Sequence, residues 1–358
     1  MDIQRSAARP ELRALTGLRG VAATVVVLGH FNPPLPYHLE HFFHWYTAAV
    51  DLFFCLSGFT LSYVYSGKSF HFSTYLIARI ARIYPLYLVT LLTIGAAYTI
   101  PDRVSPETYP ASVAMADFAR QLLMVNDWPI VGSGVHWNAP AWSISIEWLC
   151  YLLLFPVLLR LKPPSENTRF LLLVALSAAT YAILLFFEGR LTNGLPYGEP
   201  NAWSQWAATL RGASAFAVGW IAYWSYRQRD GIHSLCSRYS TAIWLCFGAV
   251  LTLSYLDTIR PQTVVLFFPF LVLTATDACS QPSRVLGSAP IHYLGDISYS
   301  IYMVHFAMFI VFAHVVGRSA TWTAPVYVAL IATTVVVSAL TYWFIERPSR
   351  GAIRRSRR

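Results

Sequence analysis

The chain has 358 residues, of which 56% are hydrophobic and 12% are charged, and its formal net charge is +9. Soluble domains usually carry about a quarter charged residues, so this composition excludes an ordinary soluble globule. Apolar segments of about 20 residues alternate with short polar stretches, which is typical of a polytopic membrane protein. A basic chain can also indicate a nucleic-acid partner. We expect none here, because the basic residues lie between apolar segments in alternate loops.

The apolar pattern predicts an all-α transmembrane helical bundle of about ten spans. When these spans are threaded through a membrane, all but six of the 26 Lys and Arg residues lie on the side of the N-terminus. Because basic residues concentrate on the cytoplasmic side, this asymmetry predicts that both termini face the cytoplasm. The predicted spans cover residues 14–33, 46–65, 77–100, 140–160, 169–188, 207–226, 241–257, 262–278, 292–314 and 324–345.

The N-terminal segment has the basic residues and the apolar run of a signal peptide. Arg19 interrupts the run, however, and no A-x-A cleavage site follows it. We therefore expect an uncleaved first span. The five cysteines are odd in number and have no CxxC spacing, which argues against a disulfide framework. The sequence also lacks HExxH, P-loop and GxGxxG motifs, so we expect no bound metal.

The first predicted span carries one ionisable residue near each end. Arg19 and His30 are eleven residues apart, which corresponds to about 16 Å along a helix axis, or about half of the hydrocarbon core. Ionisable residues are costly inside a bilayer, so each of them marks a candidate functional site. The residues that face these two side chains are the next candidates.

Carboxylates in two other spans are candidates to support His30. Asp51 lies near the expected outer end of the second span, at the depth of His30. A carboxylate beside an imidazole orients the ring and stabilises its protonated form, as in a general base. The alternative is that Asp51 lies exposed among lipid headgroups. Glu147 lies inside the fourth span, where it must face a cavity or a cation. Its available partners are His30, Arg19 and Arg211, and purely structural pairing is the alternative to catalysis.

Two arginines lie at the expected cytoplasmic entrance of the third span. Arg79 and Arg82 are three residues apart, so they share one helical face. Two guanidinium groups on one face suit a bound phosphate or pyrophosphate. Considered by spacing alone, anchoring of the span at the cytoplasmic surface is the better explanation.

Three other features predict structure more than chemistry. Ser57 and Gly58 in the second span indicate close helix packing. His305, within the ninth span, is interpreted as a hydrogen-bonded core histidine in preference to a catalyst. Residues 346–348, Glu-Arg-Pro, are expected to stop the last helix at the inner surface.

These features fit either a membrane-embedded transferase or a transporter. The expected outer loops, residues 101–138 and 189–205, contain aromatic and polar residues that suit sugar binding. Interfacial aromatic belts explain them about as well. A proton-coupled transporter or flippase of a glycolipid or small solute would use the same buried charges as a path. Transporters often contain internal repeats or matching broken helices, and neither is visible in this sequence.

Six stretches of the chain, in order, resemble the acyltransferase-3 family of integral membrane O-acyltransferases, which modify bacterial surface and secreted glycans. The family's Arg-x10-His hallmark is matched by Arg19 and His30. The other five are residues 51–59 (D-x-F-F-x-L-S-G-F), 79–87 (R-x-x-R-I-x-P-x-Y), 142–147 (W-S-I-S-I-E), 294–305 (L-G-x-I-S-Y-S-I-Y-x-V-H) and 346–348 (E-x-P). The family often continues the fourth-span motif with a second carboxylate, which is Trp148 here.

The resemblance implies transfer of an acyl group, expected to be acetyl, from cytoplasmic acetyl-CoA. Arg79 and Arg82 would hold the CoA phosphates, and Arg19 would hold the pantetheine end or the thioester carbonyl. The site would lie in a bacterial cytoplasmic (inner) membrane that the chain crosses several times. Some members carry a fused esterase-like domain. Here residues 1–358 are expected to form a single membrane-embedded acyltransferase domain, whose short basic tail, residues 347–358, contacts inner-leaflet lipids.

On the acceptor side, the resemblance implies that a sugar hydroxyl receives the acyl group. His30, oriented by Asp51 or Glu147, would act as general base on that hydroxyl or would first accept the acyl group itself. The acceptor would be a glycan or lipid-linked glycan, with exopolysaccharide and lipopolysaccharide O-antigen as the commonest class. Nodulation lipo-oligosaccharides, macrolides and periplasmic glucans are the other possibilities.

Overall fold

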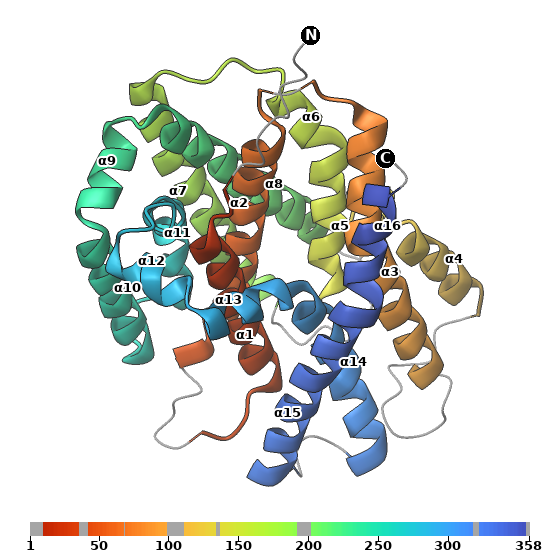
Figure 1. Ribbon diagram of the computed structural model, residues 1–358. Coiled ribbons are helices and arrows are strands. Elements are labelled where there is room, and N and C mark those ends of the chain that lie inside the picture. The colour runs from red at the N-terminus through yellow and green to blue at the C-terminus, as the bar shows by residue number, and fades with distance from the viewer. Residues whose placement is uncertain are drawn as a thin grey trace.

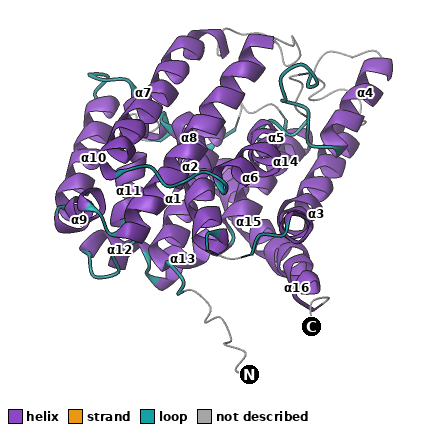
Figure 2. Cartoon of the chain, turned by 90° about the horizontal axis from the view of Figure 1, so that it is seen from above, coloured by secondary structure: helices purple, strands orange, loops and turns teal. Residues whose placement is uncertain are grey.

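The structure is a computed structural model, and it describes residues 10–35, 42–67, 69–98, 111–133, 137–191, 202–317 and 322–355. Within these ranges the chain is almost entirely helical and contains no strand (Figure 2). Seven helices of the described part are long and apolar enough to cross a membrane. The prediction of an all-α polytopic membrane protein is therefore confirmed.

The seven long apolar helices include two that are built from consecutive segments. They are α1 (Arg13–Phe31), α2 (Tyr46–Tyr65), α3 (Phe72–Tyr98), the run of α5 (Ala141–Leu149), η2 (Cys150–Leu154) and α6 (Phe155–Leu158), α7 (Glu166–Leu191), α14 (Ser298–Val316), and the run of α15 (Ala324–Thr341), η5 (Tyr342–Glu346) and α16 (Arg347–Arg355). The remaining helices are α4 (Ala111–Leu122), α8 (Ala202–Gln228), α9 (Gly231–Arg238), α10 (Ser240–Tyr255), η3 (Pro261–Phe267), α11 (Phe268–Thr274), α12 (Gln281–Leu286) and α13 (Ala289–Asp296).

The described parts of the ten predicted spans are largely helical, but not all of them are long apolar helices. The seventh and eighth fall on α10 and on η3 with α11, which form shorter apolar helices. The ninth is divided at Ile297 into α13 and α14. The number of membrane crossings and the cytoplasmic position of both termini therefore remain predictions.

Helix α1 lies in the middle of the bundle. It packs against α2, α13 and α14, while α2 in turn packs against α8. Figure 2 shows α7, α9 and α10 on one side of this centre and α3, α15 and α16 on the other. In Figure 1, α14 and α15 form a neighbouring pair, and the last helix continues from α15 into α16. The residues of α1 are thus enclosed by helices from both halves of the chain.

Helices α2 and α8 touch through their backbones. A Cβ atom at Gly58 would overlap the carbonyl oxygen of Phe216, and one at Gly219 would overlap the carbonyl oxygen of Cys55. Small residues allow such close approach between membrane helices. The packing role predicted for Gly58 is therefore confirmed. Ser57, in contrast, is part of a polar network described below.

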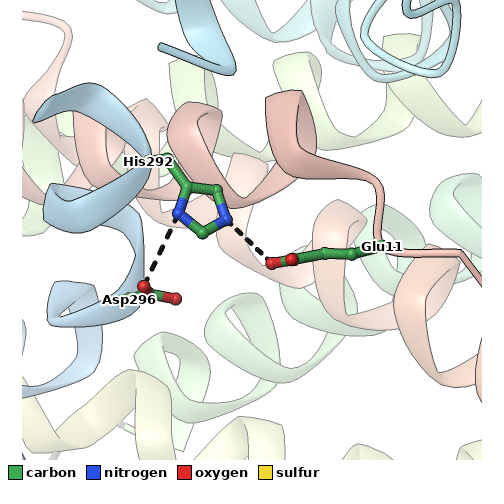
Figure 3. A group of neighbouring side chains, drawn as sticks. All are labelled: Glu11, His292 and Asp296. Atoms are coloured by element: carbon green, nitrogen blue, oxygen red, sulfur yellow. Dashed lines mark hydrogen bonds and ion pairs between the residues drawn. The ribbon is translucent and has the colours of Figure 1, made fainter. Parts of the chain in front are cut away.

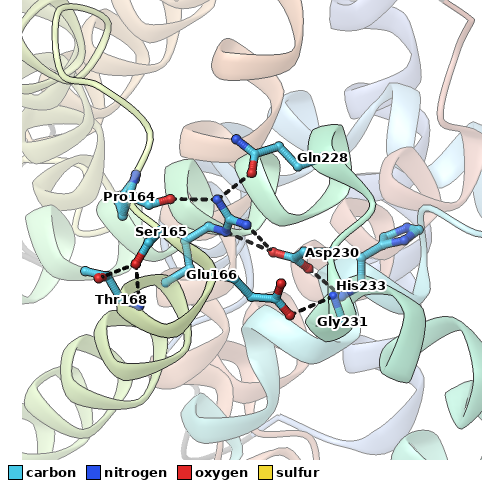
Figure 4. A network of polar contacts seen from close by, with 9 residues as sticks. Pro164, Ser165, Glu166, Thr168, Gln228, Asp230, Gly231 and His233 are labelled. Carbon is cyan, nitrogen blue, oxygen red and sulfur yellow. Dashed lines mark hydrogen bonds and ion pairs between the residues drawn. The ribbon is translucent and has the colours of Figure 1, made fainter.

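One of the basic residues assigned to the predicted cytoplasmic side is buried. Arg169 is 2% exposed, and its Nε and Nη2 contact Asp230 Oδ2 at 2.9 and 2.8 Å. Its Nη1 donates to the carbonyl of Pro164 at 2.7 Å and to Gln228 at 2.8 Å (Figure 4). Asp230 also caps α9 by accepting from the backbone N–H of His233. This network fixes the start of α7 against the junction of α8 and α9.

The outer loops expected to bind sugar lie only partly within the described residues. Residues 99–110, 134–136 and 192–201 have no described structure. The same holds for residues 356–358 of the basic tail. The predictions for these stretches stay predictions.

The α2–α8 contact predicts opposite results for two glycine substitutions. Gly219→Ala should destabilise the protein by about 1–3 kcal/mol, because its methyl group overlaps a backbone carbonyl that no side-chain rotation can move. Gly248→Ala is the matched control, since no atom lies within 4 Å of its added Cβ and it gains helix propensity of about 1 kcal/mol. The unfolding midpoint of the detergent-purified variants measures both. Equal midpoints for the two variants would contradict the close contact.

Candidate active site

A small cavity lies between α1, α2, α5 and α14, and we call it the Arg19 cavity. Its volume is about 40 Å³. Apolar side chains form part of its wall, and its polar lining consists of Arg19, Ser57, Ser143, Glu147, Tyr299 and Tyr302. The inner ionisable residue of α1 therefore faces the Glu147 carboxylate region, as expected from the cost of burying either charge alone.

Glu147 takes its hydrogen bonds from hydroxyl groups. Ser57 Oγ donates to Glu147 Oε1 at 2.5 Å, and Tyr151 Oη donates to the same oxygen at 2.6 Å. Tyr151 lies in the π-helical turn η2, which directly follows α5 and so interrupts the α-helical spacing. Such turns occur frequently at functional sites. Of the partners proposed from the sequence, only Arg19 shares a cavity with Glu147, and none is hydrogen-bonded to it in the described part of the chain.

The two arginines of α3 have different environments. The Arg82 guanidinium lies over the Tyr299 ring at 5.7 Å, and its Nη1 pairs with Glu346 Oε1 at 2.6 Å. The Arg79 guanidinium lies over the Tyr151 ring at 5.8 Å, and the described residues supply no hydrogen-bond partner to its buried Nε. Arg82 is thus neutralised by a carboxylate, whereas Arg79 keeps its charge available.

The partner of Arg82 was not foreseen from the sequence. The expectation that residues 346–348 end the last helix is wrong, because the chain passes through the π-turn η5 into α16. Pro348 is tolerated there because it lies in the first turn of α16. Glu346 is 1% exposed, accepts a hydrogen bond from Ser300 at 2.9 Å and also pairs with Arg350. Glu346 therefore joins the end of the last helix to α3 and α14.

A second cavity adjoins the first, and we call it the His30 cavity. Its volume is about 290 Å³. Val50 and Tyr302 line both cavities, so the two meet at these side chains. Tyr302 is held by a 2.7 Å hydrogen bond with Ser143 and a 3.2 Å hydrogen bond to the carbonyl of Pro140. The polar and aromatic lining of the His30 cavity includes His30, Tyr46, Asp127, Trp142, Arg211 and Tyr302.

Two histidines from distant helices meet at the edge of this cavity. His305 is fully buried, and its Nε2 lies 3.2 Å from His30 Nδ1. His305 Nδ1 bonds to the carbonyl of Ile301, so the core role predicted for it is confirmed, but its contact with His30 was not predicted. His30 Nδ1 also lies 3.1 Å from the carbonyl of Val26.

The hydrogen-bond partners assign the tautomers of this pair. A carbonyl oxygen only accepts, so Nδ1 carries the proton in both rings. His305 Nε2 then accepts from His30 Nδ1–H, and His30 Nε2 keeps its lone pair. No described residue provides a hydrogen-bond partner for His30 Nε2, and the residue lines the cavity. This is the protonation state that a general base requires.

The expectation that Asp51 or Glu147 orients His30 is wrong. Asp51 is fully buried, and its Oδ1 pairs with Arg211 Nε at 2.7 Å. Arg211 also donates to the carbonyl of Thr47, and its guanidinium lies over the Trp142 ring at 5.2 Å. A guanidinium supplies a permanent positive charge to a buried carboxylate, which a neutral imidazole does not. The exposed headgroup position considered for Asp51 is also excluded by its burial.

One other group of side chains has the composition of a metal site. His292 Nε2 lies 2.8 Å from Glu11 Oε1, and His292 Nδ1 lies 3.6 Å from Asp296 Oδ2. Figure 3 shows the two carboxylates at opposite edges of the imidazole ring. The ligand atoms of the three residues lie within 4.8 Å of one another. The group ties α13 to the segment that precedes α1.

Comparisons with known proteins identify the family. The model of the acyltransferase domain family matches residues 12–343. Over 97% of its length the chain is 28% identical to the acyltransferase MdmB of Streptomyces mycarofaciens, and it covers 93% of that protein. It is also 22% identical to the peptidoglycan O-acetyltransferase OatA of Listeria monocytogenes, of which it covers 56%. No solved structure matches the chain.

The family match runs from the residue before α1 into η5, so it includes both cavities and both histidines. It also includes all seven long apolar helices at least in part. The chain belongs to the acyltransferase-3 family and is a multi-pass membrane O-acyltransferase.

Proposed function

We propose that the protein transfers an acetyl group from cytoplasmic acetyl-CoA to a hydroxyl group of a cell-surface or secreted glycan. It would do so in the bacterial cytoplasmic membrane. The observation that carries this proposal is the meeting of two cavities at Val50 and Tyr302, one lined by Arg19 and the other by His30. The O-acetyltransferase name of one relative supports acetyl as the group transferred.

On the donor side, Arg79 and Arg19 have the chemistry that acetyl-CoA requires. Arg79 supplies a guanidinium that no carboxylate neutralises among the described residues, which suits the CoA phosphates. Arg82 contributes by fixing Glu346 and the end of the last helix. Arg19 and Glu147 line the cavity between this region and His30, so they would contact the pantetheine arm or the thioester carbonyl.

On the acceptor side, His30 Nε2 removes the proton from the acceptor hydroxyl. The hydroxyl oxygen attacks the thioester carbonyl, the carbon–sulfur bond breaks, and the CoA thiolate takes the proton that His30 received. His305 orients His30 by accepting its Nδ1–H, the role that a carboxylate has in a Ser-His-Asp triad. The alternative course, in which His30 Nε2 first accepts the acetyl group, uses the same atom and the same orientation.

His30→Ala should abolish transfer, because it removes the imidazole whose Nε2 is the proposed base. Membranes that contain the variant are supplied with labelled acetyl-CoA, and label is followed into glycan. His314→Ala is the matched control, since His314 lies on α14 and, like His30, bonds a helix carbonyl, but it lines neither cavity. Full transfer by His30→Ala, with a normal amount of the protein in the membrane, would contradict the role proposed for His30.

Two substitutions of His305 separate orientation from packing. His305→Leu should lower kcat at least about tenfold, which is part of the 10²–10⁴-fold that general-base catalysis contributes, with the KM for acetyl-CoA unchanged. His305→Gln should recover part of kcat, because its amide oxygen can accept from His30 Nδ1–H. Steady-state kinetics of the purified variants test this. Equal loss in both variants would mean that His305 acts through packing alone.

Arg79 and Arg82 should respond differently to neutralisation. Arg79→Gln should raise the KM for acetyl-CoA at least tenfold with little effect on stability. Arg82→Gln should lower stability by about 1.5–3 kcal/mol, because Glu346 loses a charged hydrogen-bond donor from α3 but keeps Arg350 and Ser300 as partners. Adding Glu346→Gln to Arg82→Gln should restore part of the stability. Kinetics and unfolding midpoints of the same preparations give both readouts, and identical behaviour of the two single variants would refute the distinction.

A further inference from the structure

A third and larger cavity opens onto the His30 cavity, and we call it the vestibule. Its volume is about 960 Å³. Tyr46, Thr47, Leu184 and Arg211 line both spaces, so the vestibule leads directly to the cavity that contains His30. Neither of the outer loops that the sequence suggested for sugar binding provides its described lining. That lining comes from His44, α2, α7, α8, the connection between α10 and η3, and the first residues of η3.

The connection between α10 and η3 presents a fixed set of polar side chains. Its backbone is held by hydrogen bonds from Asp257 N–H to Ser254 O at 3.0 Å and from Thr258 N–H to Leu253 O at 2.9 Å. Asp257 has a φ of 53°, which places it in the left-handed region that ends a helix with a sharp turn. The vestibule residues of this segment are Asp257, Thr258, Ile259 and Arg260, and Pro261, Gln262 and Thr263 follow them at the start of η3.

Arg211 lies where the vestibule joins the His30 cavity. It is 6% exposed, and its Nε and Nη2 are engaged by Asp51 and by the carbonyl of Thr47. The described residues give no hydrogen-bond partner to its Nη1. Because Asp51 and Trp142 fix the guanidinium, a donor is held in place at the junction before any ligand arrives. Such preorganised donors cost little ordering when they bind.

We propose that the vestibule is the acceptor-binding site and that it takes a neutral saccharide of two or more rings, with Arg211 donating to an oxygen near the hydroxyl that is acylated. This inference rests on the proposed function. The volume of the vestibule lies at the upper end of the range of about 300–1,000 Å³ that holds a drug-sized ligand. This space is larger than one sugar ring needs.

The charges of the vestibule favour a neutral polyhydroxylated ligand over an anionic one. Arg211 is already paired with Asp51, and the connecting segment offers one carboxylate, Asp257, and one guanidinium, Arg260. Hydroxyl donors and acceptors are plentiful, whereas an unbalanced cluster of cations, as phosphate recognition requires, is not found in the described lining. Tyr46 and Tyr181 supply aromatic rings on which the apolar face of a sugar can stack.

A blocking experiment tests the site without disturbing the Asp51–Arg211 pair. Cys246→Ser and Cys279→Ser remove the two exposed cysteines, since the other three are buried. Thr258→Cys is then introduced and modified with a charged, membrane-impermeant methanethiosulfonate reagent. Leu256→Cys is the matched control, because Leu256 is 60% exposed two residues away but does not line the vestibule. Arg260→Gln, unmodified, is a second variant.

Membranes from the source cells, with their own glycan, receive labelled acetyl-CoA, and binding of acetyl-CoA to the purified protein is measured separately. Blocked Thr258→Cys should transfer label to glycan at least tenfold more slowly than blocked Leu256→Cys, with acetyl-CoA binding unchanged in both. Arg260→Gln should slow transfer in the same direction. Three results would overturn the inference. They are transfer at the wild-type rate by both blocked Thr258→Cys and Arg260→Gln, a loss of acetyl-CoA binding as large as the loss of transfer, and label in a lipid or peptide product. Absence of any transfer by the unsubstituted protein would instead overturn the proposed function.

Discussion

The cost of placing charge in a membrane bundle determines how this protein is assembled. A charged side chain at the bilayer centre costs several kcal/mol at least, so each buried charge must find a partner. Asp51 joins α2 to α8 through Arg211, and Glu346 joins the last helix to α3 through Arg82. Glu147 is satisfied by hydroxyl groups of α2 and η2. These contacts determine which helices are neighbours. The two cavities lie beside α1 as a result.

Helical character and the depth of Arg19 and His30 follow from the sequence, because apolar length and residue spacing are local properties. Partner choice is not local. Asp51 has a histidine and an arginine at accessible depths, and only the rotation of α2 against α8 decides in favour of Arg211. The close contact of Gly219 with the Cys55 carbonyl sets this rotation. A single sequence does not show which helix Gly219 approaches.

One error of the sequence interpretation has its origin in helix geometry. The π-turns η2 and η5 each shift the helical register, and η5 continues the last helix into α16 past Glu346, which pairs with Arg82. A pattern interpreted with a uniform helical period does not include such a shift. The Glu-x-Pro motif at residues 346–348 was a signal for the second of these turns, since a proline in mid-helix requires a local break.

The histidine pair shows why a carboxylate is not needed beside His30. In a soluble active site, a buried aspartate orients the base and stabilises its cation. A carboxylate bonded directly to His30 would add a buried charge that needs its own partner. His305 gives the orientation without the charge, because a neutral imidazole with Nδ1 bonded to the Ile301 carbonyl presents a lone pair at Nε2. The cation that forms on His30 during transfer is then stabilised less than in a charged triad, which favours prompt return of the proton to the CoA thiolate.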